Sequence, residues 1–306
     1  MPDVKVVLHL GAHKTASTYL QSRLAKSSNA LRQMQVGYVD LKTFREVVAR
    51  AGGLRRCQHR YAMLSQRTLR AELSGLIQRE NILGAERVVL SDENILGHLC
   101  DLSNAGKFYP TAGPRLRVIR EALRDWDLEI VVSVRDYVTF LPSVWSHMVL
   151  REGYQPFSPQ VARAFLTGGR GWAEVLQDLQ RAAPGVPLRL WTFEEFAKLE
   201  ADVLETLVGP VSRSAVDPLG RHAMPGLSGA AVERIEDLVR NGETPTPDRV
   251  RKISQQFAKA NGHMPYMPWT EDVATRLGAR YATDLERISR MPDVFRIGSD
   301  TLRRAA

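Results

Sequence analysis

Four short apolar runs, separated by longer helical patterns, constrain the fold of this 306-residue chain most strongly. The runs are rich in β-branched residues and are bounded by loops, which is typical of buried strands. They cover residues 4–10, 87–90, 129–134 and 187–192. Strands that alternate with helices predict an α/β fold of three layers, with a mostly parallel sheet and helices on both faces. Ligands of such sheets bind beyond the carboxyl ends of the strands, so the residues after each run are the site candidates.

The pattern changes after residue 218, where no further strand is predicted. Apolar residues at helical spacing predict C-terminal helices over residues 228–240, 247–260 and 271–290. We therefore expect an α/β core at residues 1–220 and a helical C-terminal part at 221–306. The helical part should pack on the core, so that the whole chain forms one structural domain.

Composition and charge limit the classes of partner and compartment. The chain has 42 Lys and Arg against 34 Asp and Glu, which favours anionic partners. The basic residues are scattered, so no nucleic-acid-binding arm is predicted. Cys57 and Cys100 have no neighbour at metal-ligand spacing, which fits a reducing compartment. The first apolar run is too short to span a membrane and lacks a signal-peptide layout, so we expect a cytoplasmic protein, and no membrane association is indicated.

The loop after the first run has the features of a phosphate site. Gly11 permits a tight turn, and Ser17 and Thr18 supply hydroxyls where a helix begins. The first amides of that helix have no intrahelical acceptors, and Lys14 adds a positive charge beside them. The loop is not the ATPase pattern G-x-x-x-x-G-K-[ST], because no glycine directly precedes Lys14. A glycine turn with a Ser/Thr cap would also start a plain helix, but a lysine and three hydroxyls exceed what capping requires.

A second anion-binding element follows the third run. Arg135 stands at the carboxyl end of that strand and Ser143 lies eight residues later, about two turns into the next predicted helix. Both side chains can converge on one anion at the sheet edge that carries Lys14. Taken alone, the segment would favour a pairing of Arg135 with Asp136 or another carboxylate over an anion site.

Together the two elements resemble the nucleotide-binding motifs of sulfotransferases that use 3′-phosphoadenosine 5′-phosphosulfate (PAPS). Residues 14–18 are similar to the family's 5′-phosphosulfate loop, with Ala16 in the place of the usual glycine. Arg135 and Ser143 are similar to its 3′-phosphate motif, with Tyr137 where proline is frequent. Trp172 and the segment 190–196 look like features of bacterial carbohydrate-type members. The resemblance covers residues 4–290 and implies a P-loop NTPase-like fold.

The resemblance also implies roles for individual residues. Lys14 would neutralise the leaving group, and 3′,5′-adenosine bisphosphate (PAP) would be the product. The residues implied in binding the nucleotide are Gly11, His13, Lys14, Thr15, Ala16, Ser17, Thr18, Arg135 and Ser143. The acceptor would be a hydroxyl of a carbohydrate or small metabolite, and neither a metal ion nor nucleic acid is expected.

Sulfuryl transfer to a hydroxyl also needs a base for the acceptor proton. Glu93 follows the second run and is the first candidate, since carbohydrate-type members use a glutamate; His98 is second and His13 third. A helix cap or a solvated turn carboxylate is the alternative role for Glu93. The remaining histidines have no recognisable partner and are expected to be ordinary: His9, His59, His147, His222 and His263.

Two other functions stay open. Asp92 stands where a kinase would place a magnesium-binding acid, so a nucleotide or metabolite kinase is possible. A non-catalytic nucleotide-binding relative is the third candidate. The acceptor would contact the loops at 51–61, 101–115 and 167–172, whose basic residues would suit an acidic acceptor: Arg55, Arg56, His59, Lys107, Arg115 and Arg170.

Overall fold

The computed structural model describes residues 4–51, 66–99, 108–210, 213, 216 and 226–298. Its sheet has six strands, all parallel, in the order β2-β3-β1-β4-β5-β6. The strands are β1 (Lys5–His9), β2 (Val36–Val39), β3 (Arg87–Ser91), β4 (Asp127–Val134), β5 (Leu188–Thr192) and β6 (Val294–Arg296). The predicted parallel α/β sheet is confirmed. Cys57 and Cys100 lie outside the described residues.

All four predicted strands are present, but two further strands were missed. β2 has only four residues, one of them a glycine, and is too short for a periodicity to be recognised. β6 has three residues that are exposed or half-buried and pairs with β5 at the sheet edge. The expectation that no strand follows residue 218 is therefore wrong, because a segment inside the predicted helical part completes the sheet.

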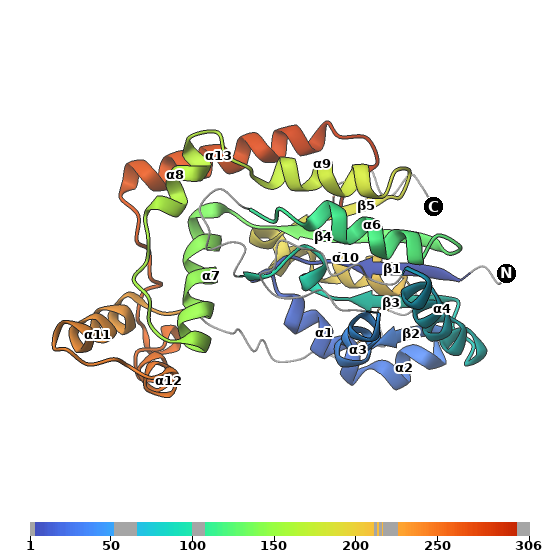
Figure 1. Cartoon of the computed structure of the whole chain (residues 1–306), viewed down its shortest axis with the longest axis horizontal. Helices are drawn as coiled ribbons and strands as arrows, with labels where there is room; N and C mark the ends of the chain where they lie inside the picture. The colour runs from blue at the N-terminus through green and yellow to red at the C-terminus, as the bar shows by residue number, and fades with distance from the viewer. Residues whose placement is uncertain are drawn as a thin grey trace.

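Helices cover both faces of the sheet, as Figure 1 shows, which confirms the three layers. Alternate side chains of β1 separate the two faces: Val6 and Leu8 join one apolar core, and Val7 joins the other. The first core contains α3 (Leu41–Arg50), α4 (Gln66–Ile82), α6 (Ala112–Ala122), α9 (Trp172–Ala182) and α13 (Glu271–Ser289). The second contains α1 (Ser17–Lys26), α2 (Ser28–Gln33) and α10 (Phe196–Val208).

A smaller apolar cluster lies at the far end of α7 (Tyr137–Glu152), where Trp145 and Val149 pack against two C-terminal helices. These are α11 (Gly229–Arg240), which begins close to its predicted start and is capped by Ser228, and α12 (Pro247–Gln256). They project beyond the sheet at the end of α7, away from α8 (Gln160–Leu166). α12 ends earlier than predicted, and the chain continues into a 3-10 turn, η4 (Lys259–Asn261).

The connections from the central strands set the position of the site. From β1 the chain passes to α1 on one face, whereas from β3 it passes to α6 on the other face. A ligand crevice is expected where neighbouring strands send the chain to opposite faces. The carboxyl ends of β1 and β3 form such a point, and the predicted loop lies there.

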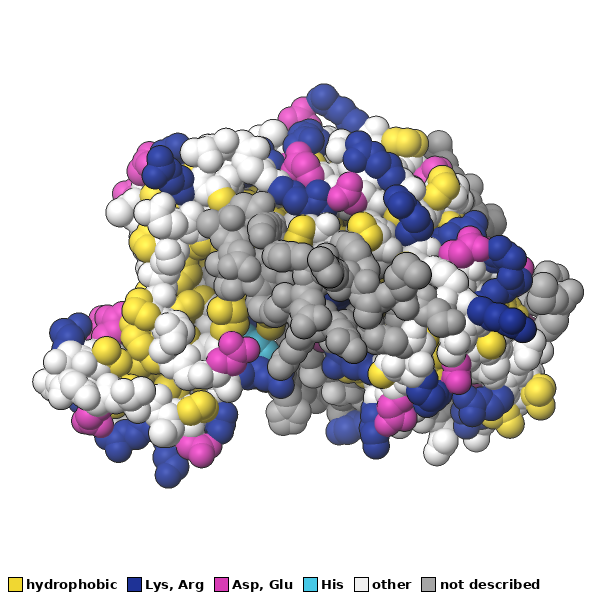
Figure 2. Space-filling view, in the orientation of Figure 1, with side chains coloured by type: hydrophobic (Ala, Val, Ile, Leu, Met, Phe, Trp, Pro, Cys, Tyr) yellow, Lys and Arg dark blue, Asp and Glu magenta, His cyan; other side chains and the backbone are white. Residues whose placement is uncertain are grey.

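The surface and the helices add two observations. On the face in Figure 2, Lys and Arg side chains are interspersed with Asp and Glu and do not gather into one stripe. Within the described residues, no helix combines the length and the apolarity needed to cross a membrane.

Candidate active site

The loop between β1 and α1 curls through three residues with left-handed backbone. The φ angles are 55° at Gly11, 64° at Lys14 and 69° at Ala16. A Cβ atom on Gly11 would lie 2.2 Å from Ser17 Oγ, so only glycine fits there. Ala16 is the N-cap of α1, and its left-handed conformation costs about 1–2 kcal/mol. Among the described residues no side chain caps α1, so its first amides remain available to an anion.

The hydroxyls of the loop differ in what they contact. Thr15 is fully buried: its Oγ1 donates to Ala12 O (2.7 Å), accepts from Ala12 N–H (3.1 Å) and lies 2.5 Å from Ser133 Oγ. Ser17 Oγ donates to Ala12 O at 3.2 Å. Thr18 is exposed in the first turn of α1. Thr15 therefore fixes the shape of the loop, and the Thr18 side chain is open to solvent at the start of the helix.

Arg135 joins the loop to the second predicted element. Its Nη1 donates to Lys14 O at 2.7 Å and to Ser143 Oγ at 3.4 Å. Its Nε donates to Thr139 Oγ1 at 3.0 Å, and the guanidinium lies over the Phe193 ring, 4.3 Å from the centroid. The structure thus brings Lys14, Arg135 and Ser143 to one place at the carboxyl edge of the sheet.

A third cation, Lys259 of η4, completes this group. Burial and then the charges of Arg135 and Lys259 lower the pKa of Lys14 to about 8. Burial lowers the pKa of Arg135 to about 10, and burial with the charge of Arg135 lowers that of Lys259. Within the described part of the chain, none of the three forms an ion pair with a carboxylate. Although Glu194 and Asp136 also act on Arg135, three neighbouring cations without an ion pair favour the binding of an anion.

No pattern in the sequence marked Lys259, which stands 116 residues after Ser143 and in a segment predicted as helix. Only the packing of α12 on α7 brings η4 back to the sheet edge. A single lysine among many scattered basic residues carries no signal of its own.

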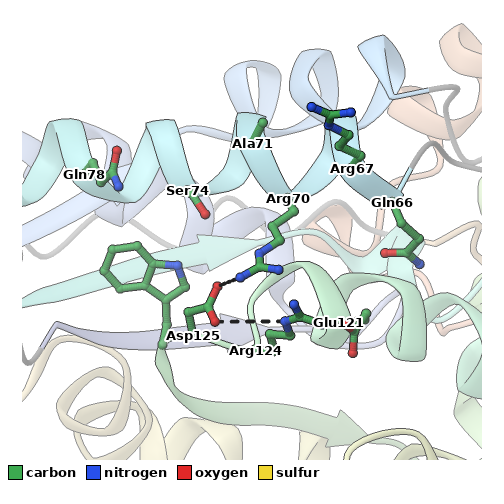
Figure 3. A pocket seen from close by; sticks show the side chains of 10 residues that line it. Gln66, Arg67, Arg70, Ala71, Ser74, Gln78, Glu121, Arg124 and Asp125 are labelled. Atoms are coloured by element: carbon green, nitrogen blue, oxygen red, sulfur yellow. Dashed lines mark hydrogen bonds and ion pairs between the residues drawn. The ribbon is translucent and has the colours of Figure 1, made fainter. Parts of the chain in front are cut away.

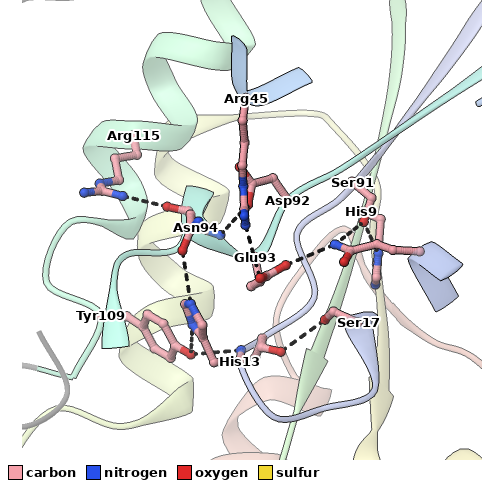
Figure 4. Close-up of polar contacts among 12 residues, drawn as sticks. His9, His13, Ser17, Arg45, Ser91, Asp92, Glu93, Asn94, Tyr109 and Arg115 are labelled. Atoms are coloured by element: carbon pink, nitrogen blue, oxygen red, sulfur yellow. Dashed lines mark hydrogen bonds and ion pairs between the residues drawn. The ribbon is translucent and has the colours of Figure 1, made fainter. Parts of the chain in front are cut away.

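Glu93 begins η1 (Glu93–Ile95) directly after β3, and both of its carboxylate oxygens are occupied (Figure 4). Oε2 accepts from Gln21 Nε2 at 3.0 Å, and Oε1 accepts from Arg45 Nη2 at 3.2 Å. Burial acts to raise the pKa of Glu93, but neighbouring His13 and the hydrogen bonds outweigh it, and the pKa lies below its ordinary value. The carboxylate is ionised at neutral pH and can accept a proton.

Asp92 is engaged within the protein. Its two oxygens accept from Arg45 Nη2 at 2.7 Å and Nε at 3.1 Å, and Oδ1 also accepts from Asn94 N–H at 3.0 Å. A carboxylate held by an arginine fork in this way is not directed at a phosphate site.

His13 has both ring nitrogens bonded inside the protein. Tyr109 OH lies 3.0 Å from the ring Nδ1 and also accepts a hydrogen bond from the backbone N–H of His13 at 3.2 Å. Asn94 Oδ1 lies 3.3 Å from the ring Nε2. The neutral ring with its proton on Nε2 satisfies all three contacts. Burial lowers the pKa of His13 to about 4, so the ring stays neutral near pH 7.

Two other histidines lie near the site. His98 is half-buried, and its charge contributes to lowering the pKa of His13. His147, which the sequence left without a partner, stands one turn after Ser143 on α7. Burial and then the charge of Lys14 lower the pKa of His147 to about 4. The four-residue spacing from Ser143 was the available sign that this ring faces the site.

The predicted acceptor contacts are placed only in part. Arg115 is buried and donates to Asn94 O at 2.6 Å. Arg170 donates to Phe108 O at 2.7 Å and pairs with Asp178 at 2.6 Å. Both therefore support the protein's own structure. The other basic candidates lie outside the described residues: Arg55, Arg56, His59 and Lys107.

A separate groove runs along α4 to the segment that precedes β4 (Figure 3). Arg70 and Arg124 line it, and both have carboxylate partners: Arg70 pairs with Asp125, and Arg124 pairs with Glu121 at 2.5 Å. Because it reaches the amino end of β4, this groove is distinct from the cation group at the carboxyl edge.

Comparison with known proteins gives a distant structural likeness. No family model matches the sequence, and no curated protein matches it. Among solved structures, the chain is similar to a sulfotransferase from Alicyclobacillus acidocaldarius, with 13% sequence identity and a TM-score of 0.40. The match covers 85% of this chain and 98% of that one. A likeness this distant does not assign a site, so the candidate site is defined by the contacts around Lys14, Arg135 and Glu93.

Proposed function

We propose that this chain is a PAPS-dependent sulfotransferase that acts on a hydroxyl group of a carbohydrate or small metabolite. The observation that carries the proposal is the group of Lys14, Arg135 and Lys259, three cations without a carboxylate partner among the described residues. The group extends from a phosphate-type loop to a second element, and so suits a nucleotide with phosphates at two positions.

The two parts of the cation group would bind the two phosphate positions of the nucleotide. The first turn of α1, Lys14 and Thr18 would bind the 5′-phosphosulfate, where the loop is curled and the helix is uncapped. Arg135, Ser143 and Lys259 would bind the 3′-phosphate. Since Arg135 already holds the Lys14 carbonyl at 2.7 Å, the two parts are fixed relative to each other.

The transfer itself requires alignment, charge neutralisation and a proton acceptor. The acceptor oxygen attacks sulfur, the bond between sulfur and the phosphate oxygen breaks, and PAP leaves with its new negative charge beside Lys14. The acceptor proton passes to the Glu93 carboxylate, which is ionised at neutral pH. Glu93 is favoured over His13 because each carboxylate oxygen keeps a second lone pair, whereas the one lone pair of the neutral His13 ring accepts from Tyr109 OH.

The kinase alternative is less favoured by the same contacts. It required Asp92 as a magnesium ligand, but Arg45 and the Asn94 amide occupy that carboxylate. Magnesium-dependent turnover of ATP would reverse this ranking.

Calorimetry with PAP and AMP tests the proposal. We expect PAP to bind at least about tenfold more tightly than AMP, since a charge-assisted hydrogen bond contributes about 1.5–3 kcal/mol. The Lys14→Ala variant should bind PAP more weakly and transfer sulfate from PAPS much more slowly to any acceptor that the wild type uses.

Equal affinities for PAP and AMP would contradict the two-phosphate site. Tight PAP binding without transfer to any member of a broad glycan and phenol panel, together with no effect of Glu93→Gln, would identify a non-catalytic relative.

A further inference from the structure

One side chain connects the phosphate loop with the proposed base. Gln21 is buried on α1, one helical turn after Ser17, the residue at which the helix leaves the loop. Its Nε2 donates to Glu93 Oε2 at 3.0 Å and to Ser91 Oγ at 3.2 Å. An amide nitrogen carries two hydrogens, so these contacts use both of them.

The second contact continues into the sheet. Ser91 Oγ lies 2.8 Å from His9 Nδ1, so the last residues of β1 and β3 are joined beneath the loop. Both residues are fully buried, and burial lowers the pKa of His9 to about 4, which keeps its ring neutral. The Gln21 amide is therefore anchored on a rigid, neutral support and not on another mobile side chain.

Arg45 holds the other oxygen of Glu93, but its position is set differently. Its guanidinium is bound mainly to Asp92, at 2.7 and 3.1 Å, and contacts Glu93 at 3.2 Å. Arg45 belongs to α3, which does not begin at the loop. Of these two side chains, only Gln21 belongs to the helix that begins at the phosphate loop.

We propose that Gln21 is a positioning residue that fixes the Glu93 carboxylate relative to the phosphate loop and so couples donor binding to the alignment of the base. The base role of Glu93 depends on the proposed function, whereas the Gln21–Glu93 contact does not. Because a helical turn is rigid, a displacement of the loop by a bound phosphate is transmitted to the Gln21 amide and from there to Glu93.

A titration of Glu93 tests the contact directly. We would follow the carboxyl carbons of glutamate-labelled protein by NMR and assign Glu93 from the Glu93→Gln variant. Gln21→Leu removes both hydrogen bonds and should raise the pKa of Glu93 by about one unit, since hydrogen bonds favour the ionised form. Gln21→Glu places a like charge beside it and should raise the pKa further.

Ser22→Ala is the matched control, because Ser22 is the next residue of α1 and is exposed. It should leave the titration unchanged. If leucine disturbs packing, Gln21→Met keeps the length and flexibility of the side chain. PAP affinity and melting temperature identify the variants that are folded.

Turnover gives the second measurement. In the folded Gln21→Leu variant we expect kcat to fall at least about tenfold, while the KM for PAPS changes less than about twofold. In the pH profile of kcat, the acid limb should move to higher pH together with the pKa of Glu93. An unchanged Glu93 titration in the folded variant would overturn the inference, whatever the chain catalyses. A shifted titration in a chain that transfers no sulfate would support the Gln21 contact and count against the proposed function.

Discussion

The pKa of Lys14 is strongly shifted by the surroundings of its ammonium group. Its pKa of about 8 lies well below the ordinary value of 10.5, because the ammonium group is buried beside Arg135 and Lys259. The unfolded chain therefore binds more protons than the folded one between pH 8 and 10.5. The contribution of Lys14 to the free energy of unfolding of the nucleotide-free protein should therefore rise with pH across this window.

Nucleotide binding should show the opposite dependence on pH. An anion beside Lys14 raises its pKa, so binding above pH 8 takes up a proton, and PAP affinity should fall by up to about tenfold per pH unit there. Calorimetry in buffers with different ionisation enthalpies measures the proton uptake. In Lys14→Met the uptake should disappear; if it persists unchanged, another group is responsible.

Sequence reasoning identified the residues of the loop but not the contacts of each. It left open whether Arg135 would pair with Asp136, and the structure instead has Arg135 on the Lys14 carbonyl and Ser143. The Asp136 carboxylate caps α7 by accepting from Val138 N–H at 3.0 Å. A one-dimensional pattern cannot decide between these partners, because the choice depends on how the β4–α7 turn faces the loop.

At the scale of elements, η4 makes the C-terminal segment part of the site. Lys259→Ala should lower PAP affinity by about tenfold or more, because a charge-assisted contact is lost, and should leave AMP affinity nearly unchanged. Lys252→Ala, an exposed lysine on neighbouring α12, is the control for a general change in charge. Titrations at one fixed ionic strength make the comparison valid. Equal losses for PAP and AMP would place Lys259 away from the 3′-phosphate.

Elements with strong periodicity were predictable, and those set by tertiary contacts were not. The position of α11 followed from the sequence, as did β1, β3, β4 and β5. The roles of Gln21 and Lys259 could not be predicted from the sequence. Gln21 contacts Glu93, which lies 72 residues later in the chain. Lys259 is linked to the site by the effect of the Arg135 charge on its pKa.

At the scale of the whole molecule, α13 is joined to the core by a buried polar network. Asp284 is fully buried and accepts from Tyr137 OH and from Trp172 N–H, and its other oxygen lies 3.3 Å from Arg280. Trp172 Nε1 in turn donates to Arg135 O at 2.8 Å. The network therefore extends from the C-terminal helix to the main chain of the anion site.

Asp284→Ala should destabilise the protein by about 1–3 kcal/mol, because it leaves the buried Tyr137 hydroxyl without its charged acceptor. Arg290→Ala, which removes an exposed ion pair with Glu286 on the same helix, should cause no measurable change. Urea denaturation of both variants gives the comparison. Similar stabilities would show that the network does not hold α13.

The place of Lys259 and Asp284 so late in the sequence has a consequence for synthesis on the ribosome. The loop at Lys14 and the strand before Arg135 emerge first, yet the third cation of the site arrives only when residue 259 has been made. The network that holds the Arg135 main chain closes later still, with residue 284. A nascent chain therefore carries an incomplete site until residues 259 and 284 have been made, and tight capture of nucleotide should await both of them.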